Sequence, residues 1–262
     1  MPALIFRVLI LCLLISLLNT AKAQKEIVID DSLAANATKL NVKMGGQGFG
    51  KTWKFRFGDY GVVSSKAGWT STTAKGNLFN TKTESKSTQK FSFVMTNKGN
   101  DSALVNAASN INTKELHGFE ISPSFSVGED ELLYESNNFS VYIYINNDST
   151  DTWALLMNIT RGSKTEKSWE AVLSNGVTKI FLYPVSSLKD SKDNQSFPAR
   201  GYEFIENEKS IGAVQYLGGG MIGYNKNIVW LDNRLDEKTK LILAAAMTAI
   251  MQKKTAEMGR LN

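Results

Sequence analysis

The sequence predicts a mainly β fold, an antiparallel β-sandwich or open barrel of about ten short strands with one C-terminal α-helix packed on it. Three observations favour this fold class. Apolar and polar residues alternate in many short runs, turn residues separate the runs, and one long helical pattern closes the chain. No stretch divides the sequence into compositionally different halves, so we expect a single β-rich domain over residues 24–262.

The first 23 residues have the pattern of a secretory signal peptide. Arg7 provides the positive charge, Val8–Leu18 is an apolar segment of suitable length, and Ala21–Ala23 is a typical cleavage site. An uncleaved anchor helix is the alternative. We expect cleavage before Gln24 and a secreted or periplasmic protein without a membrane span. The single cysteine, Cys12, lies in the apolar segment, so the mature chain is expected to be cysteine-free.

Period-two alternation defines the predicted strands. In the clearest run, residues 139–145, four apolar side chains alternate with Ser140, Tyr142 and Tyr144. Further predicted strands cover residues 53–57, 90–93, 153–160, 168–174, 179–183, 201–205, 211–217 and 227–231. Pro184 should end one of them, and the polar stretches 71–88 and 186–200 should be exposed loops.

The C-terminal helix is predicted over residues 235–258. Its apolar residues recur at helical spacing and form one stripe, which consists of Leu243, Ala246, Met247, Ile250 and Met251. Because such a stripe needs an apolar surface to face, we expect the helix to pack on the sheet. The apolar run 241–251 is far shorter than the ~20 residues that a membrane-spanning helix needs.

Residues Gly45–Thr52 match the P-loop pattern G-x-x-x-x-G-K-[ST] letter for letter. A P-loop needs a helix directly after it, because the helix N-terminus supplies amide donors and a positive dipole end to the phosphates. Residues Trp53–Phe57 alternate as a strand instead, and the leader directs the chain out of the cytosol. We therefore expect a glycine-rich loop between strands and no bound nucleotide.

Residues Gly218–Gly223 match the dinucleotide pattern G-x-G-x-x-G after a predicted strand, again without the required helix. The simplest interpretation is a turn or bulge where two backbone segments pass closely. In the alternative, this loop shapes a ligand cleft, and Gly218, Gly220 and Tyr224 are kept as candidate ligand-binding residues.

Catalytic and metal chemistry has few candidates in this sequence. His117 is the single histidine, and neither a second metal-binding imidazole nor a G-x-S-x-G elbow accompanies it. Carboxylates are the remaining route, because a glycosidase needs only two of them across a cleft, and Glu131 and Glu203 are the candidates. Sequence proximity does not establish that geometry. We predict no catalytic residue, no metal site and no cofactor.

Tyr142 and Tyr144 are the candidate ligand-binding residues of the run 139–145. Two tyrosines two residues apart on one strand face form a platform on which a sugar ring can stack. In the alternative, both sheet faces are covered and the tyrosines belong to the core or its rim. Loss of Arg7 and Lys22 lowers the net charge from +5 to +3, which does not by itself indicate a nucleic-acid partner.

The leading functional hypothesis is a secreted or periplasmic non-catalytic protein. It would be a binding module for a glycan or another envelope ligand, or a structural component of the cell envelope. One alternative is a carboxylate-dependent secreted hydrolase that acts on glycans. Another is a carrier of apolar ligands, in which Phe93 and Ile143 would line a hollow barrel.

Overall fold

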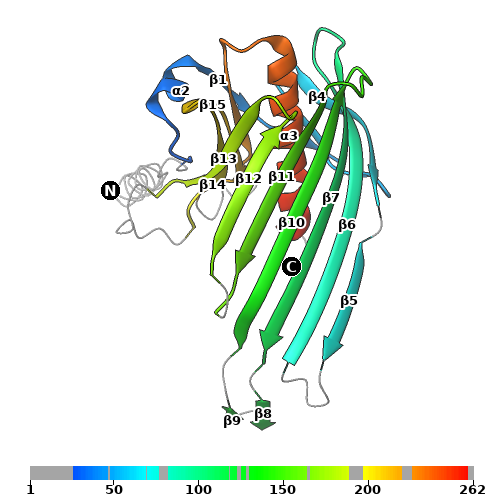
Figure 1. Ribbon diagram of the computed structural model, residues 1–262, viewed down its shortest axis with the longest axis vertical. Coiled ribbons are helices and arrows are strands. Elements are labelled where there is room, and N and C mark those ends of the chain that lie inside the picture. Colours follow the sequence, from blue (N-terminus) through cyan, green and yellow to red (C-terminus); the bar gives the residue numbers. More distant parts are fainter. Residues whose placement is uncertain are drawn as a thin grey trace, which may run out of the picture.

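The computed structural model describes residues 26–46, 48–68, 70–76, 82–117, 119–122, 125–127, 130–163, 166–188, 197–219 and 226–258. The expected signal peptide, Gly220 and Tyr224 lie outside these residues and stay predictions. The described part is mainly β, as predicted. One antiparallel sheet curves into a nearly closed barrel around the long C-terminal helix α3 (Glu237–Met258) (Figure 1).

Fourteen strands of the described residues form the large sheet, in the order β1-β16-β15-β14-β13-β12-β11-β10-β7-β6-β4-β3-β2, with β5 also paired to β6. Their bounds are β1 (Ala37–Asn41), β2 (Lys43–Gly45), β3 (Lys54–Phe57), β4 (Tyr60–Ala67), β5 (Ser71–Gly76), β6 (Lys82–Thr96), β7 (Ser102–Leu116), β10 (Glu131–Ile145), β11 (Thr152–Arg161), β12 (Ser168–Ser174), β13 (Lys179–Ser186), β14 (Arg200–Glu206), β15 (Lys209–Leu217) and β16 (Ile228–Asp232). A separate hairpin consists of β8 (Phe119–Ser122) and β9 (Phe125–Val127). A short helix, α2 (Asp31–Asn36), precedes β1.

A single segment, residues 37–45, joins the two ends of the sheet. Its first part is β1, which pairs with β16 at one end of the strand order, and its last part is β2, which pairs with β3 at the other. Between the two parts, the Val42 amide donates to the Asn227 carbonyl at 3.1 Å. This segment changes its pairing partner at Val42 and so brings the two ends of the sheet together into a nearly closed barrel.

Helix α3 fills the closed part of the barrel. The predicted apolar stripe is buried, but burial extends to all sides of the helix from Leu241 to Lys253. It contacts β7 and β10 on one side and β15 and β16 on the other. The apolar run 241–251, which is too short to span a membrane, is thus apolar on all sides because the curved sheet surrounds it. Gln252 ties this helix to the barrel wall, because its side-chain amide exchanges two hydrogen bonds with the Trp53 backbone, at 3.1 and 2.5 Å.

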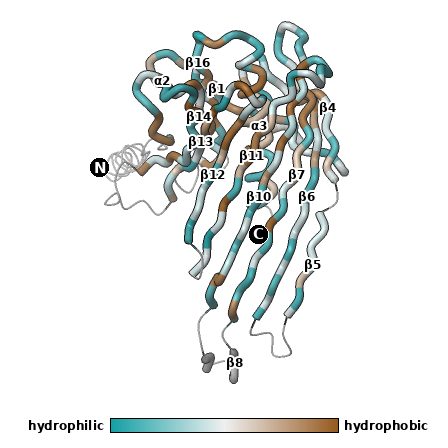
Figure 2. Tube along the Cα trace, viewed as in Figure 1, coloured by the Kyte–Doolittle hydropathy of each residue, from teal (hydrophilic) through white to brown (hydrophobic). Residues whose placement is uncertain are grey.

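Beyond the C-terminal end of α3 the longest strands continue as a polar arm (Figures 1 and 2). β6, β7 and β10 have 15 residues each, or about 50 Å at 3.4 Å per residue. The inner face of β6 is apolar and buried at Phe91, Phe93 and Met95, but in residues 82–90 it carries serine, threonine and glutamine. Hydroxyl and amide side chains link the strands there, as in the contact of Ser85 Oγ with Thr113 Oγ1 at 2.5 Å.

Three predictions about the strands are corrected. The structure has more strands than the predicted ten, and residues 71–88, predicted as a loop, contain β5 and the start of β6. This stretch is hydrated on both faces, so it lacks the apolar alternation that marks a half-buried strand. Pro184 does not end its strand, because β13 continues to Ser186. Past Phe181 this strand pairs only with β14, and a strand with one open side tolerates proline.

Candidate binding surface

The outer face of the sheet carries the predicted tyrosines. Along β10, Phe139, Val141 and Ile143 point to the barrel interior and are at most 1% exposed, whereas Tyr142 is 47% exposed. Tyr144 is partly buried on the same face. The structure therefore places the two tyrosines together on an open sheet face, which is the geometry of the stacking platform. Whether they bind a ligand stays a prediction.

Three more large side chains stand half exposed on this face. They are Leu156 of β11 at 47%, Phe181 of β13 at 48% and Tyr183 of β13 at 51%. Leu156 pairs with Val172 of β12, and Val172 pairs with Phe181, so this row crosses three neighbouring strands. At about 4.8 Å per strand, Leu156 and Phe181 are about 10 Å apart along the sheet. We call the set of Tyr142, Leu156, Phe181 and Tyr183 the outer stripe.

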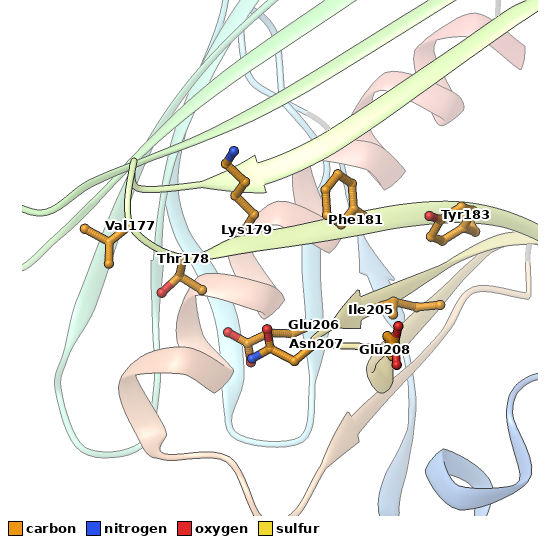
Figure 3. Close-up of a pocket in the computed structure, with 9 residues that line it drawn as sticks. All are labelled: Val177, Thr178, Lys179, Phe181, Tyr183, Ile205, Glu206, Asn207 and Glu208. Carbon is orange, nitrogen blue, oxygen red and sulfur yellow. The ribbon is translucent and has the colours of Figure 1, made fainter.

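A groove of about 680 Å³ adjoins the outer stripe at β13. Figure 3 shows Phe181 and Tyr183 on one side of it and the β14–β15 turn with Glu206, Asn207 and Glu208 on the other. The remaining lining residues are Val177, Thr178, Lys179 and Ile205. Two aromatic rings thus face a turn with carboxylate and amide groups, and Lys179 adds an ammonium donor.

The β14–β15 turn holds its polar side chains with an unusual backbone. Glu206 pairs with Lys209 and leaves a two-residue turn, in which Asn207 has a φ of 47° and Glu208 a φ of 64°. Positive φ at both central residues is typical of the type I′ turns that connect twisted antiparallel strands. Asparagine tolerates this conformation, but glutamate is strained in it. The turn joins the strands predicted at residues 201–205 and 211–217 into a hairpin, with strain at a residue that lines the groove.

Described strands flank both glycine-rich patterns. β3 follows Gly45–Thr52, so the helix that a P-loop requires is replaced by the expected strand. Gly218 is buried directly after β15, and β16 follows at Ile228, again a strand. Gly218 does not line the groove at β13, and the remaining candidates of that loop, Gly220 and Tyr224, lie outside the described residues.

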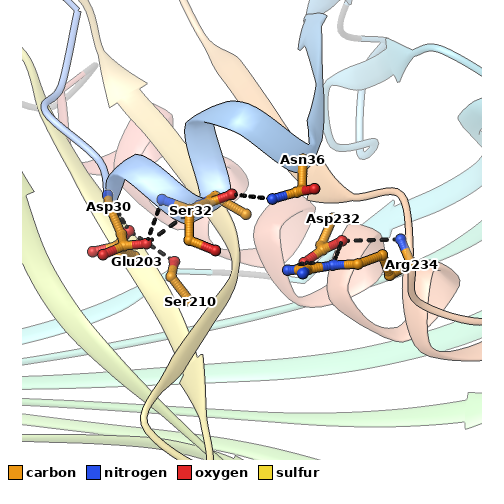
Figure 4. A network of polar contacts seen from close by, with 8 residues as sticks. Asp30, Ser32, Asn36, Glu203, Ser210, Asp232 and Arg234 are labelled. Carbon is orange, nitrogen blue, oxygen red and sulfur yellow. Dashed lines mark hydrogen bonds and ion pairs between the residues drawn. The ribbon is translucent and has the colours of Figure 1, made fainter.

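The candidate carboxylates lie in separate environments. Glu203 is 8% exposed, and its Oε1 accepts hydrogen bonds from the Asp30 amide at 2.8 Å and the Ser210 hydroxyl at 2.7 Å (Figure 4). It therefore anchors the segment that leads into α2. Glu131 begins β10 in the polar arm, four strands away in the sheet order. His117 Nε2 lies 3.8 Å from Glu115 Oε2, and His117 Nδ1 lies 3.6 Å from Asp130 Oδ1. Among the described residues no His, Cys, Asp and Glu cluster suits a metal ion.

Sequence reasoning missed Phe181 and Tyr183 as surface residues. They were recognised as parts of a strand, but they alternate with Ile180 and Leu182, so apolar side chains lie on both faces. Period-two alternation cannot tell which face of such a strand is buried. The polar turn 206–209 marks the exposed face of this strand only once the structure places it next to Phe181 and Tyr183.

Comparisons of the chain with protein-family models, curated proteins and solved structures found no match. In the part of the chain that the structure describes, none of the helices has the length and apolar character needed to cross a membrane.

Proposed function

We propose that this protein is a secreted or periplasmic glycan-binding protein that holds its ligand on the outer stripe and in the adjoining groove. The observation that carries this proposal is the half-exposed pair Phe181 and Tyr183 beside the polar turn 206–208. Secretion is supported by the leader pattern of residues 1–23.

The chemistry of a sugar matches the two sides of the groove. A sugar ring has an apolar face of C–H groups, which stacks on an aromatic ring, and a rim of hydroxyl groups, which need hydrogen-bond partners. Phe181 and Tyr183 provide the rings. Glu206, Asn207 and Glu208 provide acceptors and an amide donor. Tyr142 and Leu156 continue the surface across the sheet, so an extended chain of several sugars fits better than a single one.

The structure offers less support for the other functions. A hydrolase needs two carboxylates across a cleft, whereas Glu203 is engaged by Asp30 and Ser210, and Glu131 lies in the polar arm. A carrier of apolar ligands needs interior space, but Phe93 and Ile143 are 1% and 0% exposed inside a barrel that α3 occupies. We therefore favour binding without catalysis.

Affinity electrophoresis tests the proposal, with neutral and acidic envelope polysaccharides cast into native gels. We expect at least one polysaccharide to retard the protein. For the double variant Phe181→Ala, Tyr183→Ala, we expect the dissociation constant derived from the retardation to be at least tenfold higher. Phe49→Ala is the matched control, since Phe49 is an exposed aromatic residue outside the outer stripe. Equal retardation of the double variant, or no retardation by any glycan, would reject the proposal.

A further inference from the structure

The last turns of α3 carry charged side chains inside the open end of the barrel. We call Lys253, Lys254, Glu257 and Asn137 of β10 the α3-end cluster. Lys253 Nζ lies 2.5 Å from Glu257 Oε1, and Lys254 Nζ lies 2.9 Å from Oε2 of the same carboxylate. Asn137 Nδ2 donates to Oε1 at 3.3 Å. The side chains of Lys253, Lys254 and Glu257 are only 3%, 17% and 25% exposed, so the cluster is largely removed from bulk water.

The charges of this cluster do not balance. Two ammonium groups share the single carboxylate of Glu257, which leaves one surplus positive charge. Among the described residues, Glu135 of β10 and Arg161 of β11 also interact with the cluster, but they pair with each other at 2.8 Å and add no net charge. Burial lowers the pKa of Lys253 to about 8 although Glu257 opposes this shift. A buried surplus charge is costly, and an anion can compensate it.

Two buried polar atoms on the same wall have no hydrogen-bond partner among the described residues. They are Asn137 Oδ1 and Ser109 Oγ, on residues that are 7% and 4% exposed. Ser109 of β7 lies opposite Phe139 in the register, next to the row of Asn137. Buried acceptors normally receive a hydrogen bond, so Asn137 Oδ1 calls for a donor such as a hydroxyl group.

An aromatic wall faces the cluster from the other side of the barrel. Trp169 of β12 stacks on Tyr202 of β14 with ring centroids 5.2 Å apart, and Tyr202 lies 5.2 Å from Tyr216 of β15. Lys254 Nζ is 5.4 Å from the Tyr216 ring centroid. Trp169 and Tyr216 are partly exposed. The open end therefore combines a cationic group, an unused acceptor and aromatic rings.

We propose that the α3-end cluster binds a small hydroxycarboxylate such as a sugar acid. Its carboxylate accepts hydrogen bonds from Lys254 and compensates the surplus charge, and its ring packs on Tyr216. Because Asn137 Oδ1 is buried, the Asn137 side chain turns toward the ligand and accepts a hydrogen bond from one of its hydroxyl groups. This site lies on the inner side of the sheet and is independent of the outer stripe.

Thermal unfolding at pH 7 and low ionic strength tests the proposal with five probes. We expect glucuronate to raise Tm by several degrees with saturation, acetate to raise it less, and glucose and sodium chloride to leave it unchanged. An oligomer of glucuronate distinguishes a free sugar acid from the end of a glycan. If the site takes only a free acid, glucuronate alone raises Tm. If the site takes the end of a glycan, glucuronate and its oligomer both raise Tm. Equal shifts with all salts, or no shift with glucuronate, would overturn the proposal.

Two variants separate binding from folding. Lys254→Met leaves the neutral pair of Lys253 and Glu257, so we expect it to fold and to lose the glucuronate shift. Asn137→Ala should keep the carboxylate effect but lose the preference of glucuronate over acetate. Lys240→Met, at the other end of α3, is the matched control and should behave as the wild type. A full Tm shift of the Lys254→Met variant with glucuronate would also contradict the proposal. Phe181→Ala, in the outer stripe, should leave the glucuronate shift unchanged.

Discussion

Alternate side chains of β10 meet two different environments. Ile143 is fully buried against the interior that α3 fills, while Tyr142, one residue away, is 47% exposed on the outer face. The inner face of β10 stabilises the fold, because its large apolar side chains pack against α3 or neighbouring strands. The half-exposed residues of the outer stripe make no comparable contribution to the core. Ligand binding therefore explains their exposure better than folding does.

The largest contrast is expected in stability. Ile143→Ala should lower the free energy of unfolding by about 2–5 kcal/mol, because it leaves a cavity between β10 and α3. Tyr142→Ala should cost about 1 kcal/mol or less, since much of its ring is already hydrated. Urea unfolding of both variants checks this. If Ile143→Ala instead altered uptake of an apolar ligand more than stability, the inner face would be a carrier cavity.

The buried Lys253 on the inner side of the barrel should make the free energy of unfolding depend on pH in the alkaline range. Because the pKa of Lys253 is lowered to about 8, below the 10.5 of an exposed lysine, the unfolded chain binds more protons between these values. The free energy of unfolding should therefore rise from pH 8 to 10.5, by about 3 kcal/mol for this group. Lys253→Met should lack this rise. The measurement is urea unfolding of both proteins across this range in chloride buffer, and identical slopes would contradict the burial of a charged Lys253.

Glu257 gives a second rise of the free energy of unfolding with pH, at the acid end of the range. Burial alone would raise the pKa of this carboxyl, but Lys254 and Lys253 outweigh it and lower the pKa to about 2. The contribution of Glu257 is present above its unfolded pKa of 4.5 and is lost as the pH falls toward 2. Glu257→Gln should therefore flatten the stability profile between pH 5 and 2, which acid unfolding followed by circular dichroism measures. An unchanged acid profile would place Glu257 in water.

The outer face should show the reverse pattern, with small effects on folding and larger effects on binding. Stacking on an aromatic ring contributes about 1 kcal/mol, so loss of Phe181 and Tyr183 together should weaken glycan binding roughly tenfold to thirtyfold. Each single alanine variant should keep most of the stability of the wild type. Isothermal titration with the retained glycan measures the affinity, and Leu156→Ala, with a smaller apolar surface, should lie between the wild type and the double variant.

The smallest effect tests the strained turn. Glu208→Gly removes the cost of a side chain at a φ of 64° and should raise the free energy of unfolding by about 0.5–1 kcal/mol. If Glu208 contacts the glycan, the same variant should bind more weakly. Gain of stability with loss of affinity would mark the turn as a functional compromise, whereas unchanged affinity would remove Glu208 from the binding surface.

The sequence was sufficient for elements with a strong periodic signal. β12 was predicted with its observed bounds, and α3 within two residues of its start, because their apolar residues follow one clear period. β5 and the start of β6 were missed, since Ser, Thr and Lys on both faces resemble a loop. Tyr142 was identified, but Phe181 was not, because the face it occupies depends on pairing with distant residues of β14. The sequence also did not predict the charge cluster around Glu257, because its contact with Asn137 joins residues far apart in the chain.

The central claim is that the ligand binds the outer face and leaves the inner face undisturbed. Nuclear magnetic resonance of the protein with 13C-labelled aromatic rings tests it, during titration with the retained glycan. We predict shifts of the Phe181, Tyr183 and Tyr142 signals, while those of the buried Phe55 and Phe204 stay in place. Shifts confined to Phe55 and Phe204, or none in the outer stripe at saturating glycan, would contradict the account.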